Sequence, residues 1–111
     1  MKIYLYFGEY RLGFLEKCIE SRTLKYLWMP DINEIEKADK KYFFNMSMFF
    51  LPKEPKIYDK IPYHFADNDV LPSRKDIIDK VGITPDDDLF ARLYKLSTLE
   101  ETRIEFIIKN K

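Results

Sequence analysis

The first third of the chain alternates between apolar and polar or aromatic positions with the period of two that is typical of β-strands. Lys2–Phe7 shows this alternation most clearly, a turn is expected at Gly8–Arg11, and a second strand is expected over Leu12–Leu15. Together they predict an N-terminal β-hairpin. A third strand is predicted over Leu24–Met29, and it ends at Pro30 because proline has no N–H to donate to a ladder.

The middle of the chain changes character twice. Asp31–Lys41 is polar and predicts a short surface helix or a loop. Tyr42–Leu51 is apolar on both faces of a strand pattern, so it predicts a central strand covered on both sides. Pro52–Pro72 contains four of the six prolines and predicts a loop or a short irregular helix.

Two short helices are predicted next, each from its own capping pattern. Ser73 with Asp76 forms a capping box, and Gly82 stands where a left-handed C-terminal cap is expected. Thr84 with Asp87 forms a second capping box, with a proline at the favoured first helical position.

Alternation over Glu101–Lys109 predicts a closing strand. Early strands, two late helices and a final strand indicate an α+β fold with a mostly antiparallel sheet. A chain of 111 residues is expected to form one domain, residues 1–111.

Composition narrows the functional classes. Hydrophobic residues are 46% and charged residues 34% of the chain, which predicts a folded protein. Lysine plus arginine and aspartate plus glutamate both number 19, and the absence of a basic surplus argues against direct nucleic-acid binding. A single cysteine, no leader-like segment and no apolar run of membrane length predict a soluble cytoplasmic protein with no membrane association.

Candidate catalytic and metal-binding residues are sparse. The only histidine, His64, has no local sequence signature that would pair it as a base with Cys18. His64 with Asp67 and Asp69 is an incomplete set of metal ligands, because no second histidine or cysteine is nearby. Asp86–Asp88 is better explained by the positive end of a helix than by a cation. Three scattered glycines form no phosphate-binding loop, and no kinase-type catalytic aspartate or metal ligand occurs. We therefore expect no catalytic residues, no metal and no cofactor.

The segment Ile61–Ser73 places aromatic, histidine and acidic residues between prolines. One interpretation is a rigid loop that fills a pocket of a partner at low entropic cost. The other is that Tyr63, Phe65 and Leu71 only pin the loop to the core. Composition does not decide between these interpretations.

An ordered set of short motifs resembles the N-terminal subdomain of HipA-type kinases. Phe65–Ser73 matches an aromatic, Asp-Asn and Leu-Pro pattern, and Val81–Phe90 matches a Gly-Ile-Thr turn followed by Pro-Asp-Asp-Asp. Upstream, Tyr10–Leu15 is similar to the early hairpin of the family and Asn45–Pro52 to its Leu-Ser-rich strand. The order and spacing hold over about residues 3–96, which is most of the chain.

The departures from the family pattern are equally informative. Ala66 replaces a second aromatic, Asp69 is an insertion, and the Gly-Arg-Asp segment that leads into the kinase core is missing. A free-standing first subdomain is similar to the HipS-like antitoxins of tripartite HipBST toxin–antitoxin systems. The resemblance implies a non-catalytic protein that binds and neutralises a HipT-like serine/threonine kinase. Whether the complex also engages a HipB-like DNA-binding protein stays open, and the alternative is a non-inhibitory subunit that completes the kinase fold.

The resemblance also suggests a contact surface in the loop. We expect six residues at or near the kinase surface: Tyr63, His64, Phe65, Asp67, Asn68 and Leu71. Phe65 is the candidate for entering the active-site cleft. On this hypothesis Phe65→Ala weakens inhibition with little loss of fold stability.

Overall fold

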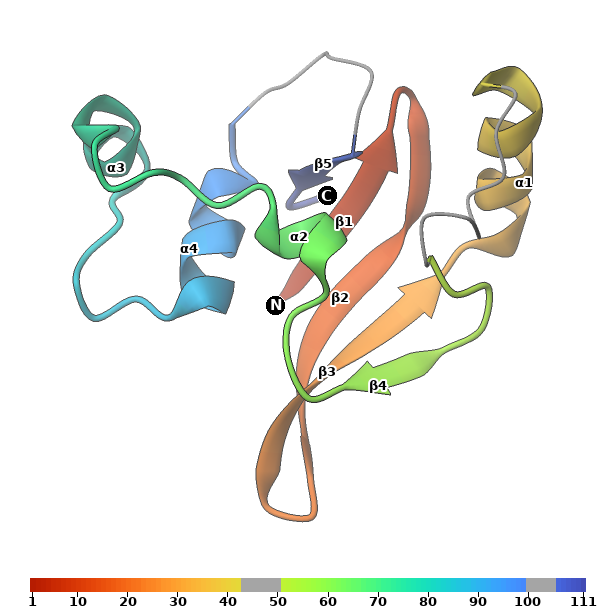
Figure 1. The fold of residues 1–111 in the computed structure, drawn as a ribbon, viewed down its shortest axis with the longest axis horizontal. Coiled ribbons are helices and arrows are strands. Elements are labelled where there is room, and N and C mark those ends of the chain that lie inside the picture. The colour runs from red at the N-terminus through yellow and green to blue at the C-terminus, as the bar shows by residue number, and fades with distance from the viewer. Residues whose placement is uncertain (43–50, 100–105) are drawn as a thin grey trace.

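An antiparallel sheet organises the fold, with its strands in the order β4-β3-β2-β1-β5 (Figure 1). The computed structural model describes residues 1–42, 51–99 and 106–111. The strands are β1 (Lys2–Phe7), β2 (Tyr10–Glu20), β3 (Thr23–Pro30), β4 (Lys56–Tyr58) and β5 (Phe106–Lys109). The helices are α1 (Ile32–Tyr42), α2 (Tyr63–Ala66), α3 (Lys75–Val81) and α4 (Leu89–Leu96). All the strand pairings in these ranges are antiparallel, which confirms the predicted α+β class.

The core lies on one face of the sheet. Alternation along β1 buries Ile3, Leu5 and Phe7, and the neighbouring strands add Leu15 and Trp28 to the same cluster. Buried side chains of the helices also belong to it: Ile35, Ala38, Phe65, Phe90, Leu93 and Leu96. Within the described ranges, no helix has the length and apolar content needed to span a membrane.

The predicted N-terminal hairpin is confirmed. A turn at Gly8 and Glu9 connects its strands, and Gly8 has a φ of +58°, a conformation that favours glycine. Gly13 in β2 has a φ of +153°, and a Cβ at this position would overlap the Met29 carbonyl and the Trp28 ring. Glycine therefore lets β2 and β3 approach closely next to the irregularity in the β1–β2 register.

β2 is longer than the predicted segment Leu12–Leu15, because it continues as a two-stranded arm with β3. Pairing with β1 stops at Glu16, whereas pairing with β3 continues to Glu20. Ser21 and Arg22 form the tip, and both have positive φ, at 51° and 64°. The tip of this arm points away from the helices (Figure 1).

The helices confirm some of the predicted boundaries and correct others. α1 realises the helical alternative for 31–41, and Gly82 ends α3 with a left-handed φ of 77°. The predicted capping box at Ser73 is wrong, because Arg74 is the N-cap residue and its guanidinium pairs with Asp76 at 3.2 Å.

The start of α4 lies four residues later than predicted. Thr84 and Asp87 bracket a turn, in which the Asp87 carboxylate accepts a hydrogen bond from the Thr84 N–H at 2.8 Å. The N-cap is Asp88, whose side chain accepts from the Ala91 N–H at 2.8 Å. The proline after Thr84 therefore belongs to the turn and not to the helix.

The remaining strand predictions have mixed outcomes. Residues 43–50 of the predicted strand Tyr42–Leu51 lie outside the described residues, and Tyr42 itself ends α1. The proline-rich segment contains the short edge strand β4, which the sequence did not predict. The closing strand is confirmed from Phe106 to Lys109, where β5 pairs with β1, and residues 101–105 lie outside the described residues.

Candidate functional site

The candidate site is the loop that joins β4 to α3, residues 61–73, which includes the single-turn helix α2. Pro62 ends the extended segment with a ψ of 149° and starts α2, because its carbonyl accepts from the Phe65 and Ala66 N–H groups, both at 3.0 Å. The Asp67 N–H then bonds to the Tyr63 carbonyl at 2.8 Å, which continues the run of tight turns. The backbone is therefore held by its own hydrogen bonds.

Two of the six predicted contact residues are buried. Phe65 is 1% exposed and packs edge-on against Trp28, with ring centroids 5.8 Å apart. His64 is 4% exposed, and its ring lies 4.8 Å from that of Phe106 on β5. The expectation that Phe65 lies at the surface is therefore wrong, and because its side chain packs α2 against the sheet, we expect Phe65→Ala to destabilise the fold.

The other four predicted residues reach the surface to different degrees. Tyr63 is 58% and Leu71 67% exposed, which is a high exposure for such large apolar side chains. Asp67 is exposed, and Asn68 is half-buried with its amide donating to the His64 carbonyl at 2.9 Å. The loop thus presents Tyr63 and Leu71 from a fixed backbone.

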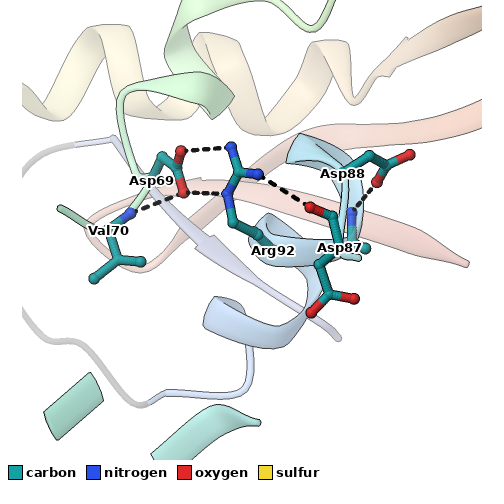
Figure 2. A network of polar contacts seen from close by, with 6 residues as sticks. Asp69, Val70, Asp87, Asp88 and Arg92 are labelled. Atoms are coloured by element: carbon teal, nitrogen blue, oxygen red, sulfur yellow. Dashed lines mark hydrogen bonds and ion pairs between the residues drawn. The ribbon is translucent and has the colours of Figure 1, made fainter. Parts of the chain in front are cut away.

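An ion pair that the sequence did not predict ties the loop to α4 (Figure 2). Arg92 donates from Nε to Asp69 Oδ1 at 3.2 Å and from Nη2 to Asp69 Oδ2 at 3.0 Å. Its remaining Nη1 donates to the Asp87 carbonyl at 3.1 Å, while Asp69 also accepts from the Val70 N–H at 2.9 Å. A two-point pairing of this kind fixes orientation as well as distance.

Asp87 and Asp88 of the Asp86–Asp88 run bind groups of this same chain. Asp87 accepts a hydrogen bond from Lys95 at 2.7 Å. The pKa of Asp87 is lowered mainly by this lysine and next by the hydrogen bond from the Thr84 N–H. The pKa of Asp88 is lowered mainly by the hydrogen bond from the Ala91 N–H and next by Lys17, whose Nζ lies 2.9 Å from the carboxylate. No cluster of three or more potential metal ligands occurs among the described residues.

The weak candidate pair of Cys18 and His64 is not brought together. Cys18 lies opposite Lys25 in the β2–β3 arm, whereas His64 packs against β5 on the far side of β1. Leu71 and Asn68 instead line a small pocket of about 200 Å³, together with apolar side chains of α3, α4 and β5. This volume is small for a cofactor and is comparable to that of a single side chain.

Comparison with known proteins gives no relative: no family model, no curated protein and no solved structure matches this chain.

Proposed function

We propose that this protein is a HipS-like antitoxin, which binds a HipT-like serine/threonine kinase in the cytoplasm and neutralises it by protein–protein contact. The ordered motif resemblance over about residues 3–96 supports the family. The observation that carries the mode of action is the exposure of Tyr63 and Leu71 on a loop fixed from both ends. A large apolar side chain on a rigid support loses little entropy when it fills a pocket.

In this proposal some loop residues contact the kinase and others support the loop from inside the protein. Tyr63 and Leu71 contact the kinase, and the exposed Asp67 offers a carboxylate to a lysine or arginine of the partner. Phe65 acts from inside, because its contact with Trp28 fixes the direction in which the loop projects. The proposal needs no catalytic group and no cofactor on this chain, and a HipB-like DNA-binding protein would be reached through the kinase.

The test is co-expression with a HipT-like kinase from the same gene cluster, scoring growth and co-purification. The wild-type chain is expected to restore growth and to co-purify with the kinase. The double variant Tyr63→Ala/Leu71→Ala is expected to lose both, since exposed anchors of this kind contribute about 2 kcal/mol or more each to binding. Ile19→Ala is the matched control, because Ile19 is 78% exposed but lies on the arm.

Each outcome separates the alternatives. Binding without growth rescue would favour a structural subunit that completes the kinase fold. A loop variant that still binds and rescues would remove the loop from the mechanism. A wild-type chain that neither binds nor rescues would refute the antitoxin proposal.

A further inference from the structure

The face of the sheet opposite the core carries a group of aromatic side chains, which we call the outer face. The β1–β2 register places Tyr4 beside Phe14, and their rings meet edge to face with centroids 5.8 Å apart. Tyr6 lies two residues further along β1 and therefore on the same face. All three rings are half-buried, whereas the alternate residues of β1 are in the core.

Each ring on the outer face has a cation placed over it from a neighbouring strand. The Lys2 Nζ lies 4.4 Å from the ring centre of Phe14, and the Arg11 guanidinium lies 4.9 Å from that of Tyr4. Lys109 on β5 lies 4.9 Å from the ring centre of Tyr6. These contacts hold three long basic side chains against the sheet, so less freedom is lost when they meet an anion.

A groove lies next to Arg11, which is the one of these three cations that lines it. It has a volume of about 570 Å³ and an apolar floor that includes Tyr4, Phe14 and Met29, with Arg11 and the first residues of α1 along its sides. Asp31 also lines the groove, where its carboxylate accepts from the Glu34 N–H at 3.3 Å. The groove is large enough for a short segment of chain.

We infer that this groove and the three cations bind an acidic polypeptide segment with interspersed apolar side chains. The apolar side chains contact Met29, Ile32 and the edges of the rings in the floor, and the acidic ones pair with Lys2, Arg11 and Lys109. A guanidinium stacked on a ring keeps its N–H edges available for a carboxylate. The inference is independent of the proposed function, because it concerns a different face of the sheet from the 61–73 loop.

Two features favour a polypeptide over a single-stranded nucleic acid. Nucleic-acid platforms need open ring faces for stacking, and here the cations lie over those faces. The Asp31 carboxylate can accept from peptide N–H groups, whereas a phosphodiester backbone offers it only further negative charge.

The test measures fluorescence anisotropy of labelled probes added to the purified chain. The probe is a short peptide of alternating glutamate and leucine, and its controls are the same peptide with glutamine for glutamate and an oligothymidylate of equal charge. The acidic peptide is expected to bind tightest, and added salt is expected to weaken its binding. The triple variant Lys2→Gln/Arg11→Gln/Lys109→Gln is expected to weaken it about tenfold.

The control variant is Lys80→Gln, which removes one positive charge from exposed α3 and should leave binding unchanged. Thermal unfolding of each variant verifies that the fold is intact. Absence of peptide binding, equal binding of the glutamine peptide, or equal binding by the triple variant would each overturn the inference. Tighter binding of the oligothymidylate would overturn it in favour of a nucleic-acid site.

Discussion

Truncating Phe65 is the sharpest test of how the loop is built. The Phe65 ring is 1% exposed and meets the Trp28 indole at an interplanar angle of 69°. Phe65→Ala removes this ring and leaves a cavity between α2 and the sheet, which destabilises a folded protein by about 3–5 kcal/mol. Small domains have a total stability of about 5–15 kcal/mol, so the variant should lose a large fraction of its free energy of unfolding.

Urea denaturation followed by tryptophan fluorescence measures this loss directly. Trp28 is the only tryptophan in the chain and is 1% exposed, so its emission should shift to longer wavelength on unfolding. The unfolding midpoint of Phe65→Ala should fall by on the order of 2 M urea. Tyr63→Ala is the matched control, because Tyr63 is 58% exposed and its removal should change stability by no more than about 0.5 kcal/mol.

The comparison can refute the reasoning in either direction. If Phe65→Ala unfolds at the same urea concentration as the wild type, Phe65 does not anchor the loop. If Tyr63→Ala is as destabilised as Phe65→Ala, the assignment of Tyr63 to the surface is wrong.

Three further predictions concern the supports of the fold. Gly13→Ala should lower the free energy of unfolding by about 1–3 kcal/mol, because a Cβ would strain the backbone and overlap the Met29 carbonyl; thermal unfolding measures it. A double-mutant cycle of Asp69→Ala and Arg92→Ala should give a coupling energy of about 1 kcal/mol, and a value near zero would mean that their pairing contributes nothing to stability. Because the pKa of Asp88 is lowered in the folded protein, its carboxylate contributes stability above its unfolded pKa of about 3.9, and this stability is lost as the pH falls through the lower folded value. Asp88→Asn should reduce the fall in the free energy of unfolding that urea denaturation measures between pH 6 and 2. The same fall in the variant as in the wild type would contradict this.

Local patterns predicted the elements whose determinants are local. The alternation of Lys2–Phe7 identified β1, and Gly82 identified the end of α3 by the left-handed conformation that glycine favours. The start of α4 was misplaced because Thr84 and Asp88 are both good capping residues. Lys17 on β2 pairs with Asp88 at 2.9 Å, and a capping pattern along the sequence does not include this long-range contact.

The sequence predicted which segment forms the candidate site, but not which of its side chains are exposed. Proline spacing located the 61–73 loop, yet in an irregular segment no period states which side chain points inward. Tyr63 and Phe65 therefore looked equivalent, and the structure separates them by burial. The Asp69–Arg92 pair had no sequence signal at all, because its members are 23 residues apart on different elements.

The contact between His64 and Phe106 has a consequence for synthesis on the ribosome. The support of the loop includes β5, which is the last of the described strands to be translated. Until β5 emerges, β1 has an unpaired edge and α2 lacks one of its packing partners. The loop therefore reaches its final form only after β5 has emerged from the ribosome, and a partner that needs this form can be bound only from that point on.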